Sequence, residues 1–188
     1  ALNLSVVGEA ATMPAYRGVR NALANQIPAG VRLAMEKITP PVINPYVWNA
    51  TLKNGKVAIG GFVPSEQARK GIIAHARRVF PRADVADTAE MAGGAPDGWD
   101  KAAAIALSQL AALRSGTADI KGREFSFVGE AADEPTAATV RKALKSDVPQ
   151  SYKLVERIGY PRANKTIAGY TMAISHSGGD VEVSGNIP

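Results

Sequence analysis

The chain has 188 residues, of which 46% are hydrophobic, 21% charged and only 6% aromatic, a composition typical of globular domains. It contains no cysteine, which excludes disulfides, cysteine nucleophiles and thiolate metal sites. Its net charge of +5 is uneven, because residues 1–95 carry 11 Lys and Arg against 6 Asp and Glu, whereas residues 96–188 carry 11 of each.

Alternating apolar residues that run into a glycine occur four times along the chain. Such alternation predicts a β-strand with one buried face, and a glycine on that face indicates a bulge, or a place where a helix packs too closely for a side chain. The four copies are Leu4-Val6-Gly8-Ala10, Val57-Ile59-Gly61-Val63, Phe125-Phe127-Gly129-Ala131 and Val181-Val183-Gly185-Ile187.

Helix-start residues follow the first three copies, because Thr12, Ser65 and Asp133 each offer a capping oxygen beside a proline. Helical periodicity then takes over, and a further strand follows each helix. In chain order, we expect a helix ending near Pro28, a strand over 31–37, a hairpin of 46–52 with 57–63, a helix ending near Pro81 and a strand over 85–90. An Ala-rich linking helix over 97–113 follows, then a hairpin of 117–121 with 124–129, a helix ending near Pro149 and a strand over 152–158. A complete module is therefore strand, turn, strand, helix, strand.

The similarity has a second level. Residues 8–11 match 129–132 at the same offset at which 19–23 match 140–144, and residues 46–64 match 170–188 without a gap. Two module types therefore alternate, A-B-A-B, and we expect the chain to be a window from a longer array whose terminal units expose unpaired strand edges. The expected units are a partial type A module truncated at its start (1–45), a type B module (46–95), the linking helix with a type A module (96–169) and a partial type B module truncated before its helix (170–188).

Residues 57–69 (VAIGGFVPSEQAR), followed by a helix and by ADVAD at 83–87, resemble the BON domain. The tandem arrangement, with GAP at 94–96 before the Ala-rich helix, resembles the N-terminal region of bacterial OmpA-family envelope proteins. The resemblance implies an α+β fold of tandem BON-like modules, with mixed small sheets and helices packed on one face. It also implies a non-enzymatic module on the periplasmic side of the outer membrane of a Gram-negative bacterium, attached to membrane phospholipid or another envelope component.

No pattern in the sequence points to catalysis. His75 and His176 lie in different modules without a recurring partner, and we interpret both as surface or interface residues. Asp97 and Asp100 open a helix, where negative charge complements the helix dipole. No HExxH pattern or phosphate-binding glycine loop occurs, so we expect no enzyme activity, cofactor or metal. The two tryptophans, Trp48 and Trp99, are expected to pack in the core.

The excess positive charge is densest in and after the helix that follows Ser65. A face of this kind can attract the phosphates of lipid or nucleic acid, although it can also be a solvated helix face. Nucleic acid is not the expected partner, because exposed aromatic residues are not interleaved with the charges. The leading hypothesis is an envelope binding and scaffold region, and the alternative is an assembly module that forms oligomers through sheet edges and helix faces. The candidate contacts with an anionic surface are Arg69, Lys70, Arg77, Arg78 and Arg82.

Overall fold

The computed structural model describes the backbone of residues 2–161, 171–177 and 180–186 and the side chains of residues 2–161. Ile187 of the fourth strand pattern lies outside the described residues, as do Gly178 and Gly179 before that pattern and the side chain of His176. The described elements at the two ends are β1 (Leu2–Glu9), α1 (Met13–Asn25) and β2 (Val31–Thr39), and the hairpin of β10 (Thr171–Ser177) with β11 (Asp180–Asn186).

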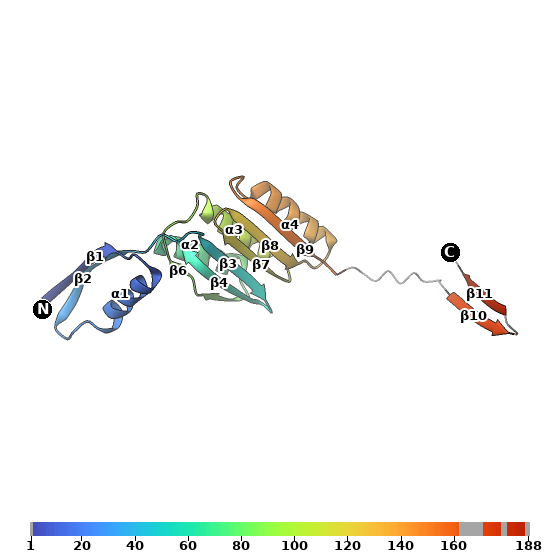
Figure 1. Cartoon of the computed structure of the whole chain (residues 1–188), viewed down its shortest axis with the longest axis horizontal. Helices are drawn as coiled ribbons and strands as arrows, with labels where there is room; N and C mark the ends of the chain where they lie inside the picture. The colour runs from blue at the N-terminus through green and yellow to red at the C-terminus, as the bar shows by residue number, and fades with distance from the viewer. Residues whose placement is uncertain (1, 162–170, 178–179, 187–188) are drawn as a thin grey trace.

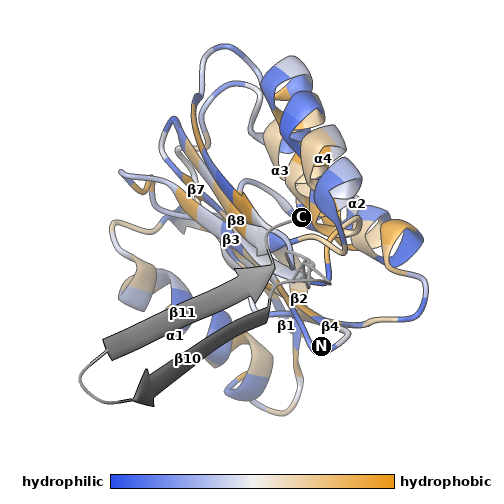
Figure 2. Ribbon diagram, turned by 90° about the vertical axis from the view of Figure 1, so that its right-hand side faces the viewer, coloured by the Kyte–Doolittle hydropathy of each residue, from blue (hydrophilic) through white to orange (hydrophobic). Residues whose placement is uncertain are grey.

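The middle of the chain forms one continuous mixed sheet with the strand order β5-β4-β3-β7-β8-β9. Helices α2, α3 and α4 cover one face of this sheet (Figures 1 and 2). This is an α+β fold, as predicted. The elements are β3 (Val47–Lys53), β4 (Lys56–Val63), α2 (Glu66–Val79), β5 (Asp84–Asp87), β6 (Glu90–Met91), α3 (Trp99–Leu110), β7 (Ser115–Lys121), β8 (Glu124–Glu130), α4 (Glu134–Asp147) and β9 (Lys153–Gly159).

Two modules of the same design meet at the centre of the sheet. Each has an antiparallel hairpin, a helix and a last strand parallel to the second hairpin strand. The first strands, β3 and β7, pair antiparallel with Ala50 opposite Ala118. These two alanines are equivalent positions of the two modules, which are 68 residues apart in the sequence. The seam between the modules is thus nearly twofold symmetric. The expectation of small separate sheets is wrong for these two modules, because β3 and β7 join them into one sheet.

A glycine occupies the same place in both modules, on the second hairpin strand. Gly61 lies opposite Trp48, and Gly129 lies opposite Gly116. A Cβ atom on Gly61 would collide with the carbonyl oxygen of Val47, and one on Gly129 would lie 2.7 Å from the carbonyl oxygen of Ser115. Only Gly61 also has a left-handed backbone, with φ 82°. Both glycines lie where a side chain would not fit, but the neighbour at Gly61 is strand β3 and not the expected helix, and the neighbours at Gly129 are β7 and Leu113, which follows α3.

The helices begin and pack largely as their sequences predict. Thr12, Ser65 and Asp133 accept hydrogen bonds from the backbone amides of Ala15, Ala68 and Thr136, which confirms all three caps. Helix α3 is shorter than expected, because Gly98 adopts φ 77° before it and the chain leaves the helix after Leu110.

The small side chains of α3 allow it to lie close to the sheet. Its residues Ala102, Ala103 and Ala106 are fully buried, together with Leu107 and Leu110 of the same helix. At its start, Trp99 packs edge-on against Trp48 with ring centroids 6.2 Å apart, and against Tyr46 at 6.1 Å. The predicted burial of both tryptophans is therefore confirmed, and this aromatic cluster fixes α3 over β3.

The expected strand over 85–90 is divided into two. β5 pairs with the first half of β4 and β6 with its end, and they are separated where Thr88 directs both its amide and its hydroxyl to the carbonyl oxygen of Ile59. The interruption faces Gly60 and Gly61, where β4 changes direction.

Substitution of Gly61 by alanine should lower the free energy of unfolding by about 2–4 kcal/mol, because the new methyl group meets backbone atoms and the left-handed φ is costly for a side chain. Gly71→Ala in α2 is the matched control, since nothing lies within 4 Å of a Cβ there, and it should stabilise by about 0.5–1 kcal/mol. Urea denaturation of both variants measures the difference. Equal stability of the two would contradict this account of Gly61.

Candidate functional site

The five basic residues around α2 do not form one surface. Ile72 and Ala76 turn one side of this helix to the core, and the charged residues are distributed around the remainder. Arg69 points toward β5, where its Nε lies 2.6 Å from Oδ2 of Asp87. Arg78 instead donates to Nδ1 of His75 on the side of α3. Lys70, Arg77 and Arg82 are exposed and make no ion pair within the described residues.

His75 joins α2 to α3. Its Nε2 lies 2.8 Å from Oγ of Ser108 and 3.1 Å from the carbonyl oxygen of Ala104. Because Nδ1 accepts from Arg78 at 2.6 Å, Nε2 carries the proton of the neutral ring. Partial burial, and secondly the charge of Arg78, hold the pKa of His75 below its usual value. The geometry makes His75 an interface residue, as one of the two predicted alternatives stated.

An apolar hollow of about 320 Å³ lies at the C-terminal end of α2. Its apolar walls come from three places, because Leu52 belongs to β3, Phe80 follows α2 and Leu113 follows α3. Two arginines, Arg82 and Arg114, are also among the lining residues. The hollow therefore combines an apolar interior with two cationic donors, which is the combination that an anionic amphiphile requires.

A second hollow of about 400 Å³ adjoins the first across Phe80 and Pro81, and Arg77 lines it. Three arginines of the chain, Arg77, Arg82 and Arg114, therefore lie around the C-terminal end of α2. Nearby acids reduce this positive charge. Asp84 lines the second hollow, and Arg114 is close enough to Asp133 to lower its pKa, although hydrogen bonding from Thr136 is the larger cause.

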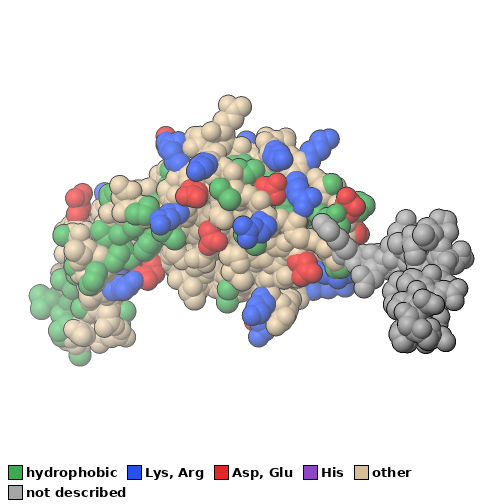
Figure 3. Space-filling model, turned by 45° about the vertical axis from the view of Figure 1, so that its right-hand side comes forward, with side chains coloured by type: hydrophobic (Ala, Val, Ile, Leu, Met, Phe, Trp, Pro, Cys, Tyr) green, Lys and Arg blue, Asp and Glu red, His purple; other side chains and the backbone are tan. Residues whose placement is uncertain are grey.

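Elsewhere on the surface the charges are mixed. Acidic and basic side chains alternate over the part of the molecule that faces the viewer in Figure 3. Asp100 occupies the first turn of α3, as predicted. The prediction is wrong for Asp97, which precedes the helix, is exposed and has Oδ2 3.7 Å from Nη2 of Arg123. Burial raises the pKa of Tyr152 to about 12. Among the described residues, no three His, Asp or Glu side chains converge in a way that could hold a metal ion.

Sequence reasoning identified Arg77 and Arg82 but missed Arg114. The local pattern around Arg114 is only a cation between a helix and a strand, and nothing in it indicates a neighbour more than 30 residues earlier. The packing of α3 beside α2 brings Leu113 and Arg114 to the hollow.

Comparisons with known proteins assign no family. No family model matches the sequence, and no curated protein matches it significantly. No helix among the described residues is both long enough and apolar enough to span a bilayer.

The partial burial of His75, and secondly the charge of Arg78, make the stability of the fold depend on pH. Its folded-state pKa lies below the unfolded value, so its contribution is present above about pH 6.5 and is lost as the pH falls through and below that value. We expect the urea midpoint to fall between about pH 7.5 and about pH 5.5. His75→Gln should reduce this fall, whereas His176→Gln should retain it. An unchanged pH dependence in His75→Gln would remove this assignment.

Proposed function

We propose that this chain is a non-catalytic binding and scaffold region of a bacterial cell envelope, built of BON-like modules, that attaches to anionic phospholipid. The observation that carries the proposal is the hollow at the end of α2, which apolar residues line together with Arg82 and Arg114. The proposed location is the periplasmic side of a Gram-negative outer membrane, on the strength of the BON-like sequence pattern.

The chemistry of the hollow favours lipid over a purely polar anion. Guanidinium groups donate paired hydrogen bonds to phosphate oxygens, and Phe80 and Leu113 beside them offer an apolar surface to an acyl chain. A free nucleic acid backbone would use the charge but not the apolar walls. Arg77, on the adjoining hollow, extends the cationic surface in the direction of α2.

The expected affinity is modest. Each basic residue near an anionic bilayer contributes about 1 kcal/mol, and this attraction weakens beyond a screening length of roughly 10 Å at moderate salt. Three arginines therefore support reversible attachment rather than permanent anchoring. Repetition of such modules along a longer chain would increase the effective affinity, because binding of one module concentrates the next at the same membrane.

Vesicle co-sedimentation tests the proposal directly. The chain should bind vesicles that contain phosphatidylglycerol at low salt, bind phosphatidylcholine vesicles far less, and be released at high salt. Arg82→Gln should weaken binding by about fivefold, which corresponds to the loss of one membrane-facing charge.

Arg157→Gln is the matched control, because Arg157 is an exposed residue of β9 outside both hollows. It makes the same change in net charge and should leave binding nearly unchanged. If the two variants lose affinity equally, the attraction is a property of net charge alone and the hollow is not the site. Absence of binding by the unaltered chain at low salt rejects attachment to lipid altogether.

A further inference from the structure

The N-terminal part of the chain repeats the design of β8, α4 and β9. Strands β1 and β2 are parallel neighbours on either side of α1, as β8 and β9 are around α4. Leu4 pairs with Leu33 as Phe125 pairs with Leu154, which is the same register at an offset of 121 residues. A bulge after Leu4 then shifts the pairing by one residue. The two segments are therefore equivalent structures, and each shows what the other contains or lacks.

The difference between them is the strand and helix that complete the second segment. The other edge of β8 is covered by β7, and α3 lies over the adjoining face. Within the described residues, β1 pairs only with β2, and its other edge is open. Hydrophobic side chains gather on the N-terminal lobe, which consists of β1, α1 and β2 and lies at the left of Figure 3.

The open edge leaves an apolar face incompletely covered. Val19 of α1 is 39% exposed, whereas its counterpart Val140 is 1% exposed. Likewise Leu23 is half-buried, whereas Leu144 is completely buried. These positions carry the apolar residues of a packed core, and they lack the neighbours that bury them in the complete module.

Gly8 and the equivalent Gly129 differ in the space around them. A Cβ atom on Gly8 would have no atom within 4 Å. At the equivalent Gly129, a Cβ would lie 2.5 Å from Cδ1 of Leu113 and 2.7 Å from the carbonyl oxygen of Ser115. Neither the backbone conformation nor the described neighbours of Gly8 require a glycine, because φ is not left-handed and a side chain would have room. If a strand lies beside Gly8 as β7 lies beside Gly129, the glycine allows the two backbones to approach closely.

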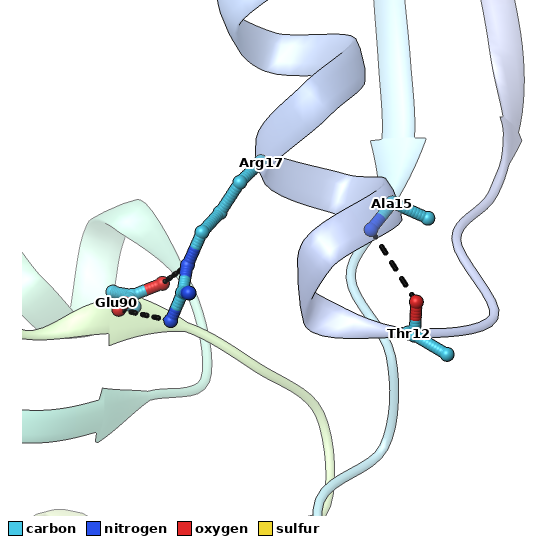
Figure 4. Close-up of polar contacts among 4 residues, drawn as sticks. All are labelled: Thr12, Ala15, Arg17 and Glu90. Carbon is cyan, nitrogen blue, oxygen red and sulfur yellow. Dashed lines mark hydrogen bonds and ion pairs between the residues drawn. The ribbon is translucent and has the colours of Figure 1, made fainter.

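The lobe formed by β1, α1 and β2 contacts the central part of the chain through α1 and not through the open edge of β1. Arg17 of α1 makes a two-pronged ion pair with Glu90 of β6, in which Nε and Nη2 each lie 2.6 Å from a carboxylate oxygen (Figure 4). Met13 and Tyr16 are buried, and Tyr16 lines a hollow together with Glu66 and Met91. The start of α1 thus contacts the central sheet, whereas β1 does not pair with it.

We propose that the open edge of β1 accepts an extended polypeptide strand of the β7 type. The strand lies antiparallel to β1, as β7 lies to β8, and is joined to it by backbone hydrogen bonds. Its sequence places a small residue opposite Gly8, as Gly116 lies opposite Gly129, and apolar residues at the next two alternate positions, as Ala118 and Ile120 do in β7. An apolar residue before the strand, in the role of Leu113, then rests on Gly8. This surface is separate from the hollow at the end of α2.

A peptide of residues 113–123 is the first probe. It should bind the full, otherwise unaltered chain and slow hydrogen exchange of β1 amides by about tenfold or more, because amides newly bonded to a strand exchange only when it opens. The second probe raises the local concentration of the strand. Residues 114–122 are inserted directly before Leu2 in place of Ala1, which recreates the two-residue turn between β7 and β8.

Gly8→Val is the decisive variant. It fits the free chain, where nothing lies near its Cβ, and valine favours a strand, but its side chain occupies the space that the incoming strand needs. Both probes should lose their protection of β1 in this variant, while thermal unfolding of the chain without a probe is unchanged. Gly18→Ala, on the exposed side of α1, is the control and should bind both probes normally.

Two results overturn the proposal: protection of β1 by neither probe, or equal protection in Gly8→Val and the unaltered chain. Self-association of the unaltered chain that Gly8→Val abolishes would support it and would identify a second copy as the donor of the strand. Vesicle binding is expected to be the same in Gly8→Val, so failure of the strand proposal and failure of lipid attachment can be distinguished.

Discussion

The antiparallel pairing of β3 with β7 is the contact on which the rest of the fold depends. It joins two small modules edge to edge, so that neither first strand leaves a row of unpaired backbone groups at the surface. Because Ala50 meets its own counterpart Ala118 at the centre, both modules present their apolar faces on the same side. One helix, α3, can then lie across that common face between α2 and α4. A single module would bury a smaller fraction of its surface than the joined pair, because buried surface increases with the size of a domain.

The same seam creates the candidate binding site. The end of α2 belongs to the first module, whereas Leu113 and Arg114 lead into the second. They line one hollow because α3 connects the modules and is held beside α2 through His75. The functional hypothesis is therefore a hypothesis about a pair of modules. A single copy of the repeat would carry Arg82 and Phe80 but not the opposite wall of the hollow.

Equivalent sequence positions have different environments according to which neighbour is present. Gly61, Gly129 and Gly8 occur in the same motif, but a side chain would meet backbone at the first two and open space at the third. Val19 and Val140 show the same contrast on the helix. A repeat therefore specifies a surface that is ready for a neighbour, and the neighbour determines whether that surface is core or interface. The hypothesis that the chain assembles through sheet edges and helix faces follows from this property of the repeat.

The sequence by itself determined the elements and the repeat that orders them. Alternating apolar residues marked the strands, and capping residues such as Ser65 and Asp133 marked helix starts, because both signals depend only on near neighbours along the chain. Arg77 and Arg82 could be predicted as candidate contacts because positive charge is densest in that part of the sequence. The tertiary structure alone decided that two modules share a sheet, that Arg69 is paired with Asp87, and that Arg114 joins Arg82. These outcomes depend on which strand edges meet and on how a helix crosses them, and such long-range choices leave no pattern in the residues nearby.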